Sequence, residues 1–177
     1  SPPTALSVMP RRAAAALARL SNGILRTAHF PDVWKLGRVI VLPKPGKPRN
    51  LPGSYRPITL LSHIAKLFER LLLRRLNKFI PLRDEQFGFR GGHSTTLQLT
   101  RVLHHLALEM NKGRHTVGVF LDMEKAFDRV WHPGLLVKLV EIGVPLALVR
   151  LVASFLQGRT FQVVVDQQLS PVRAIRA

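Results

Sequence analysis

Acidic residues follow an apolar run near the middle of the chain. Residues 117–121 are apolar or glycine and lead directly into Asp122, and Glu124 and Asp128 come shortly after it. A short apolar run of this kind predicts a buried strand, and a carboxylate at its end is well placed to hold a hard cation. Mg²⁺ prefers oxygen ligands and usually takes one or two carboxylates, with substrate phosphates completing its shell. The alternative is that Asp122 only forms a turn or caps a helix.

Cations gather in a segment that precedes this motif. Residues 43–50 combine three prolines and one glycine with Lys44, Lys47 and Arg49, and therefore predict a tight turn that carries three positive charges. Arg56 precedes Pro57, which biases it to an extended backbone from which its planar guanidinium group can clamp phosphate oxygens. The segment is either an exposed hairpin turn without further role or a turn that binds phosphate.

The charge balance is the strongest feature of the composition. The chain has 177 residues, with 27 Lys and Arg against 10 Asp and Glu, which gives a net charge of +17. Residues 1–114 hold 20 basic and 5 acidic residues, whereas residues 115–177 hold 7 and 5. A basic front half of this kind predicts a polyanionic partner, nucleic acid or nucleotide. The alternatives are a solvated basic surface and a ribosomal-type RNA-binding protein.

Several other classes of protein are excluded or disfavoured by the sequence. The chain has no cysteine, so disulfides and cysteine-based zinc sites are excluded, and its seven histidines lack metal-ligand spacing. The most apolar region, residues 135–156, is interrupted by Lys138, Glu141 and Arg150, so it does not predict a membrane span. We expect a soluble intracellular protein. Because the chain starts with Ser and ends within an unfinished pattern, we also expect a fragment.

Alternating helix and strand signals lead to the expectation of an α+β fold. Helical periodicity is present over residues 13–24, 64–80, 94–113, 135–143 and 148–158. Strands are expected over residues 36–42, 117–121 and 160–165, with a further strand through residues 172–175. Ser62 and Ser94 are expected as N-caps, and Pro81, Gly113, Gly143 and Gly158 as helix ends.

Two of these segments could contact nucleic acid. The predicted helix 64–80 has one apolar face, and its other face carries Lys66, Arg70, Arg74 and Lys78. That face is either solvated or in contact with a template. Phe87 and Phe89 lie beside Arg90 in a glycine-rich loop, where the aromatic rings either stack on bases or anchor the loop to the core. Leu99, Val102, Leu103, Leu106 and Met110 are expected to form the buried face of the next helix.

Taken in order, these segments resemble the reverse transcriptase domain of non-LTR retrotransposons, in particular the jockey-like insect elements. The resemblance covers almost the whole chain, and no single block decides it. The matching blocks are Trp34-Lys35 with Val39-Ile40, residues 42–47, residues 55–58 with 60–62, Lys66, Glu69, residues 86–90 with 93–95, and residues 120–132. Several blocks in the right order and at the expected intervals make the resemblance specific.

The resemblance implies a right-hand polymerase fold, with residues 1–114 as the fingers region and residues 115–177 as the start of the palm. Asp122 would be the first metal-binding aspartate and a catalytic residue, and the carbonyl of Met123 a further metal ligand. Phe127, with Ala126 beside it, would lie under the incoming sugar as a steric gate that excludes a ribose 2′-OH. Asp128 would be a cap or structural acid, and Glu124 a surface residue.

The resemblance also implies which cations bind substrates. Lys44 or Lys47, together with Arg56, would hold the triphosphate of the deoxynucleotide. Arg90, Arg49 and Lys66 would contact the RNA template or the DNA primer. The cofactor would be Mg²⁺, with two ions in the complete enzyme. We expect no membrane partner, and an intracellular location in a nuclear or cytoplasmic ribonucleoprotein.

Two motifs of the family are absent from the sequence. The family expects Gly-Val-Pro-Gln-Gly-Ser after a segment such as residues 171–177, and later Tyr-x-Asp-Asp, which supplies the other essential aspartates. One carboxylate cannot hold two metal ions against their mutual repulsion, so we expect this 177-residue chain to lack polymerase activity by itself. The alternative function is that of a non-catalytic nucleic-acid-binding remnant of a mobile element. We also expect residues 116–121 to lack sheet neighbours and the chain to be poorly soluble.

Overall fold

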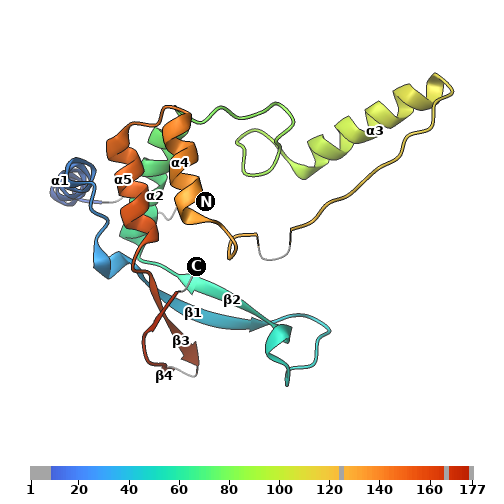
Figure 1. Cartoon of the computed structure of the whole chain (residues 1–177). Helices are drawn as coiled ribbons and strands as arrows, with labels where there is room; N and C mark the ends of the chain where they lie inside the picture. Colours follow the sequence, from blue (N-terminus) through green and yellow to red (C-terminus); the bar gives the residue numbers. More distant parts are fainter. Residues whose placement is uncertain (1–8, 124–125, 166–167, 176–177) are drawn as a thin grey trace. The chain divides into compact units, whose positions relative to one another are not determined.

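The computed structural model describes residues 9–123, 126–165 and 168–175 (Figure 1). The chain divides into two compact units, which are described separately. Unit 1 contains residues 1–80 and 129–177, and unit 2 contains Pro81–Asp128. The described residues form α-helices and a mixed sheet, which confirms the α+β class. Within these ranges no helix combines the length and the apolar character that crossing a membrane requires.

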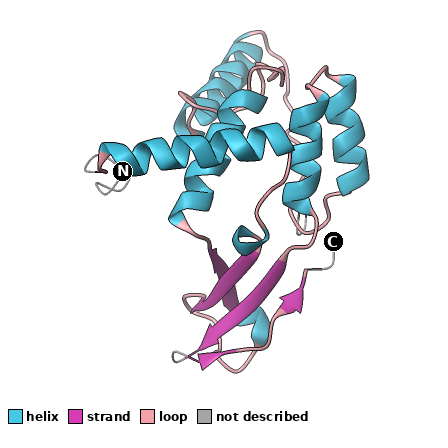
Figure 2. Cartoon of the chain, turned by 90° about the vertical axis from the view of Figure 1, so that its left-hand side faces the viewer, coloured by secondary structure: helices cyan, strands magenta, loops and turns pink. Residues whose placement is uncertain are grey.

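The sheet of unit 1 is built around one strand, β1 (magenta in Figure 2). Its strands are β1 (Leu36–Pro43), β2 (Tyr55–Leu60), β3 (Thr160–Val165), β4 (Gln168–Leu169) and β5 (Arg173–Ala174). β1 pairs antiparallel with β2, with Ile40 opposite Ile58, and parallel with β3, with Ile40 opposite Val164. Because β-branched side chains pack well on a pleated surface, these residues favour strand structure. The strands predicted over residues 36–42 and 160–165 are confirmed.

The strand predicted through residues 172–175 is present only at β5, and β4 precedes that range. β4 and β5 each pair antiparallel with β3. Between β4 and β5, Pro171 has no backbone N–H to donate. The Val163 N–H of β3 donates to Ser170 Oγ at 2.9 Å. The turn predicted at Asp166 and Gln167 lies outside the described residues.

Four helices of unit 1 pack against one another. They are α1 (Arg11–Thr27), α2 (His63–Leu76), α4 (His132–Glu141) and α5 (Leu146–Leu156), and the short 3₁₀ turns η2 (Asp32–Trp34) and η3 (Pro52–Ser54) accompany them. α4 and α5 end just before Gly143 and Gly158, as expected, because these residues have φ values of 82° and 64°, which favour glycine. α2 ends at Leu76, four residues earlier than predicted. The N–H of Phe79 donates to the Leu76 carbonyl, which tightens the last turn ahead of Pro81.

The main core of unit 1 is aromatic and surrounds Phe30, which is fully buried. Its ring packs edge-on against Trp34 and Phe155, with centroid distances of 5.6 and 5.0 Å, and lies 6.1 Å from the ring of Phe68. The Phe30 N–H also donates to Ser154 Oγ at 2.9 Å. A second cluster consists of Leu139, Val144, Val149 and Val152. This core fixes α1, α2 and α5 relative to one another within unit 1.

Unit 2 contains one long helix, α3 (Thr95–Asn111). Ser94 caps it as predicted, since Ser94 Oγ accepts a hydrogen bond from the Leu97 N–H at 3.1 Å. Ser62 also lies at the predicted N-cap position of α2, but the Ser62 side chain makes no capping hydrogen bond. Gly113 follows the end of α3 with φ 68°, as expected.

The prediction of a buried face on α3 is wrong. None of the residues of α3 is buried, and Leu103 and Met110 are 56% and 71% exposed. Amphipathic periodicity identifies an apolar stripe, but burial requires a second element that packs against it. Among the described residues, unit 2 has no other helix and no strand that could do so.

The prediction of a buried strand over residues 117–121 is also wrong. This run is extended without a strand assignment, and Phe120 and Leu121 are 94% and 91% exposed. An apolar run becomes a strand only when a neighbouring strand supplies partners for its N–H and C=O groups. No described strand pairs with it.

Candidate functional site

The loop between β1 and β2 carries the cations that were predicted to bind phosphate. Its backbone closes as a hairpin, in which the Lys44 N–H donates to the Ser54 carbonyl at 2.7 Å. The Lys44 ammonium group donates to the Gly53 carbonyl at 2.8 Å, and the Tyr55 hydroxyl donates to the Arg49 carbonyl at 2.8 Å. These bonds hold both arms of the loop, so the predicted hairpin turn is confirmed.

Arg56 lies at the same end of the hairpin as this loop. It is exposed on β2 and pairs directly with Leu42, and Pro43 with Tyr55 forms the last pair before the loop. In a sheet, directly opposed residues lie on the same face, and successive residues of one strand alternate between the two faces. Lys44 comes two residues after Leu42, so its position follows the face that carries Leu42 and Arg56. The structure therefore places Arg56 and Lys44 at the same end of the hairpin, with Lys47 and Arg49 in the intervening exposed loop.

The predicted catalytic segment belongs to unit 2. Asp122 is exposed at the end of the extended run, and Met123 next to it is 77% exposed. Ala126 and Phe127 follow in a turn, with Phe127 80% exposed and its ring 6.1 Å from the ring of Phe89 in an edge-on arrangement. Glu124 and Lys125 lie outside the described residues.

Asp122 and Met123 offer two oxygen donors to a metal ion, a carboxylate and a backbone carbonyl. Both are hard donors of the kind that Mg²⁺ prefers. Within the described ranges, however, no group of three or more His, Asp or Glu side chains could hold a metal ion. The two residues therefore fit part of a Mg²⁺ shell and leave the remaining positions to water or phosphate.

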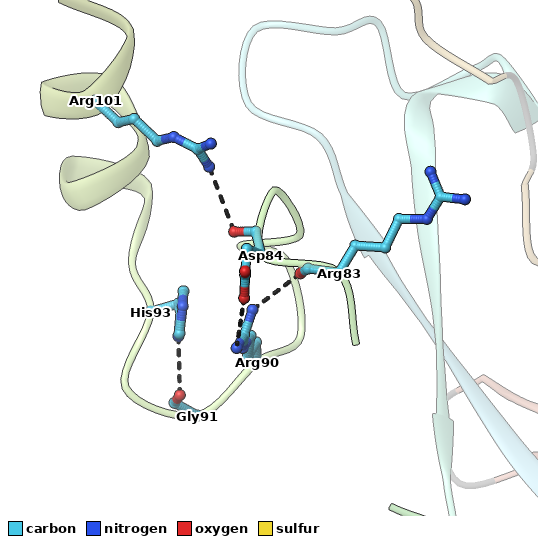
Figure 3. Close-up of polar contacts among 6 residues, drawn as sticks. All are labelled: Arg83, Asp84, Arg90, Gly91, His93 and Arg101. Carbon is cyan, nitrogen blue, oxygen red and sulfur yellow. Dashed lines mark hydrogen bonds and ion pairs between the residues drawn. The ribbon is translucent and has the colours of Figure 1, made fainter. Parts of the chain in front are cut away.

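Arg90 is tied into the loop that precedes α3, as Figure 3 shows. Its Nη1 donates to the Arg83 carbonyl at 2.9 Å, and its Nη2 lies 3.9 Å from Asp84 Oδ1. Arg101 reaches the same loop from α3, since its Nη1 donates to the Asp84 carbonyl at 3.3 Å. Arg90 therefore stabilises the loop itself, and its contact with a template stays a prediction.

The two phenylalanines of this loop behave differently. Phe87 packs edge-on against His93 at 4.9 Å, and the Arg101 guanidinium group lies 5.6 Å from the Phe87 ring centroid. Phe87 thus anchors the loop. Phe89 is 96% exposed and has a φ of 58°, so the expectation that it anchors the loop to a core is wrong.

The predicted site residues thus divide between the two units. Lys44, Lys47, Arg49 and Arg56 gather at one end of the β1–β2 hairpin in unit 1, and Lys66 is exposed on α2 of the same unit. Arg90, Asp122, Met123, Ala126 and Phe127 belong to unit 2.

The sequence reasoning missed a half-buried acid on α2, Glu69. Glu69 is half-buried, and its Oε1 is shielded from solvent without a hydrogen-bond partner among the described residues. Burial raises the pKa of the Glu69 carboxyl, while the positive charges of Arg159 and Lys66 oppose this rise. The available signal was that Glu69 is the only acid in a helix rich in Lys and Arg.

Arg159, whose positive charge acts on Glu69, is also half-buried. Its guanidinium group lies 4.6 Å from the centroid of the Phe155 ring, and its Nη1 donates to the Phe155 carbonyl at 3.3 Å. Burial lowers the pKa of Arg159, and the charge of Glu69 opposes this. Each group thus partly offsets the cost of burying the other.

Comparison with known proteins identifies the family. The sequence pattern described as "Reverse transcriptase (RNA-dependent DNA polymerase)" matches residues 42–174. The chain belongs to the reverse transcriptase family. Enzymes of this family use divalent metal ions, and the description implies an RNA template and nucleotide substrates for them.

Named relatives come from mobile elements of insects. The chain is 43% identical over 176 residues to "Probable RNA-directed DNA polymerase from transposon BS" of Drosophila melanogaster, covering 97% of this chain and 19% of the relative. It is 42% identical over 178 residues to "RNA-directed DNA polymerase from mobile element jockey" of the same species, with the same coverage. The resemblance to the reverse transcriptases of jockey-like non-LTR elements is therefore confirmed. The chain spans about a fifth (19%) of the length of these two relatives.

Proposed function

We propose that the protein is part of an RNA-directed DNA polymerase of a non-LTR retrotransposon and contributes its nucleotide-binding hairpin and first metal-binding aspartate. The family match over residues 42–174 carries this proposal, because it contains Asp122, Arg56 and Phe127 together. We also propose a right-hand polymerase fold, with residues 1–114 in the fingers and residues 115–177 at the start of the palm. The cationic β1–β2 hairpin supports this assignment, since fingers must present positive charge to the nucleotide.

The hairpin would bind the triphosphate of the incoming deoxynucleotide. Arg56 can offer two parallel N–H donors to phosphate oxygens, and Lys44, on the same face by strand alternation, adds a second positive charge. Lys47 lies in the exposed loop and can reach the outer phosphates. These fixed charges would stabilise the negative charge that builds on the phosphates during transfer.

Phe127 would control which sugar is accepted. A ring of this size beside C2′ excludes a ribose by collision with its 2′-OH, and Ala126 next to it leaves room for the deoxyribose. The exposure of Phe127 supports this role, because a steric gate must face the substrate.

Asp122 and the Met123 carbonyl would hold Mg²⁺. When bound, Mg²⁺ lowers the pKa of the primer 3′-OH and neutralises charge on the triphosphate. The 177-residue sequence has no Tyr-x-Asp-Asp motif, and its one matching carboxylate cannot hold two ions. We therefore propose that this chain does not extend a primer without further acidic residues.

Primer extension on an RNA template tests the proposal. The protein expressed from its full natural reading frame is compared with the variant Asp122→Asn, with Mg²⁺ present in both reactions. Extension that disappears in the variant supports both the polymerase activity and the metal role of Asp122. Extension that survives in Asp122→Asn would refute that role.

A second candidate function is that of a non-catalytic nucleic-acid-binding protein. The exposed basic residues of α2, Lys66, Arg70 and Arg74, favour it. This candidate predicts no extension by either protein, with salt-sensitive RNA binding retained in both.

A further inference from the structure

Arg90 lies between glycines in the exposed loop that precedes α3 (Figure 3). The sequence over residues 88–92 is Gly-Phe-Arg-Gly-Gly, and Arg90 is the only arginine of the chain that is followed by a glycine. The four residues around Arg90 in this segment are all exposed. Because three of them have no side chain, the backbone on both sides of Arg90 is open to another molecule. We call residues 88–92 the Arg90 loop.

Two glycines of the Arg90 loop are not required by the fold. A Cβ added at Gly88 or Gly91 would meet no described atom within 4 Å, and neither residue has the left-handed φ that favours glycine. Gly92 differs, because its φ is 74°. Glycine loses more conformational freedom on folding than any other residue, so its presence at positions 88 and 91 is a cost without an internal gain. Close approach of another molecule to the backbone is the other reason for glycine, and it fits both positions.

Phe89 adds a second local cost to the same loop. Its φ of 58° is uncommon for a residue with a side chain, and its ring is almost fully exposed. The described structure gives this ring one aromatic neighbour, Phe127, and no place in a core. Strained backbone of this kind persists mainly at binding and functional sites. The conformation of the loop therefore suggests a use that involves a second molecule.

The two terminal nitrogens of Arg90 are held differently. Nη1 donates to the Arg83 carbonyl at 2.9 Å. Nη2 lies 3.9 Å from Asp84 Oδ1, which is outside hydrogen-bond distance, and the Asp84 side chain is almost fully exposed. An exposed ion pair of this length contributes little to stability. Nη2 is therefore the nitrogen that the loop can release, while Nη1 keeps the side chain in place.

We propose that Arg90 is a modification site for an arginine methyltransferase, which transfers a methyl group from S-adenosylmethionine. Enzymes of this class act on arginines that are flanked by glycine. Their active sites are narrow, and a backbone without neighbouring side chains can approach the rim closely enough for the guanidinium group to enter. The Arg90 loop combines such glycines with an exposed backbone and a weakly held nitrogen. The proposal does not depend on polymerase activity.

The chemical step replaces N–H groups of Nη2 by methyl groups. Nη2 attacks the methyl carbon of the sulfonium group, and a C–N bond forms as the C–S bond breaks. The sulfur keeps the electron pair and becomes a neutral thioether, and one proton passes from Nη2 to a base of the methyltransferase. The guanidinium group therefore retains its positive charge. A second transfer to Nη2 gives asymmetric dimethylarginine.

Dimethylation at Nη2 would change what Arg90 can bind without removing its anchor. Both N–H groups of Nη1 remain, so the hydrogen bond to the Arg83 carbonyl is preserved. Nη2 would have no N–H left for Asp84 or for a pair of parallel bonds to a phosphate group. The modification would thus alter hydrogen bonding at a constant charge.

Methyl transfer to the purified protein tests the proposal. The folded protein is incubated with a type I arginine methyltransferase and S-adenosylmethionine that carries tritium in its methyl group. The test variant is Arg90→Lys. The matched control is Arg114→Lys, because the Arg114 side chain is 66% exposed against 24% for Arg90 but follows a single glycine, Gly113. The label should be lost in the test variant and retained in the control, and mass spectrometry should find asymmetric dimethylarginine at residue 90. No label in the unmodified protein, or equal labelling of the two variants, would overturn the proposal.

A second variant, Gly88→Ala/Gly91→Ala, tests whether the glycines admit the enzyme. Both positions have room for a methyl group, so the thermal midpoint should be unchanged or higher. Labelling of Arg90 should nevertheless fall severalfold. Full labelling of this variant would overturn the role of the glycines, and label that enters only the heat-unfolded protein would overturn the assignment to the folded loop. None of these measurements depends on primer extension, so their failure is distinct from a failure of the polymerase proposal.

Discussion

Phe30 is the side chain on which the packing of unit 1 should depend most. It is fully buried and makes three ring contacts, at centroid distances of 5.0, 5.6 and 6.1 Å. Truncation of a buried phenylalanine to alanine costs about 3–5 kcal/mol, from lost transfer free energy and from the cavity that remains. Because favourable aromatic pairs add about 0.5–1.5 kcal/mol each beyond area burial, we expect Phe30→Ala to lie near the upper end of that range.

The matched control is the same substitution at Phe89, which is 96% exposed. An exposed truncation should change the free energy of unfolding by less than about 1 kcal/mol. Urea denaturation followed by tryptophan fluorescence suits the measurement, since Trp34 is 9% exposed and its ring packs against Phe30. A cost below about 1.5 kcal/mol for Phe30→Ala, or equal costs for both variants, would refute the assignment of this core.

Two further predictions concern a charge and a cap. Because burial raises the pKa of Glu69, ionisation of this residue opposes folding, so stability should fall as pH rises through and above the ordinary Glu range. Glu69→Gln should flatten that part of the profile in urea midpoints measured at several pH values, and an unchanged profile would contradict the prediction. Ser94→Ala should lower the stability of α3 by about 1 kcal/mol, seen as faster amide hydrogen exchange, because it removes the bond to the Leu97 N–H. Ser62→Ala is the control and should have little effect on α2, since Ser62 makes no such bond; equal effects would count against the capping argument.

The parts of the fold that local chemistry determines could be predicted from the sequence. β1 follows from a run of β-branched residues, the end of α3 from Gly113, and the hairpin from the Pro and Gly of residues 43–50. Part of the site could also be predicted from the sequence. Arg56, which precedes Pro57, lies on the extended strand β2 as expected.

The predictions that were wrong concern packing partners, which a local sequence pattern does not reveal. Residues 117–121 have strand composition, and the apolar stripe of α3 has helical periodicity, but neither has a described element that covers it. The electrostatic influence of Arg159 on Glu69 is equally non-local, since the two residues are far apart in sequence. Periodicity therefore predicted which elements form, and it could not predict what each one contacts.

The parallel pairing of β1 with β3 has a consequence for the order of folding. It joins Leu36 to Thr160 and Ile40 to Val164, so the centre of the sheet depends on residues that are far apart in the sequence. Until β3 emerges from the ribosome, one edge of the β1–β2 hairpin has open hydrogen-bonding groups, which is the kind of edge that promotes misassociation. Contacts of such long range also slow folding, because loop closure must precede the gain from pairing. The hairpin that carries Lys44 and Arg56 thus joins residues that are close in sequence, but β1 acquires its second neighbouring strand only after β3 has been synthesised.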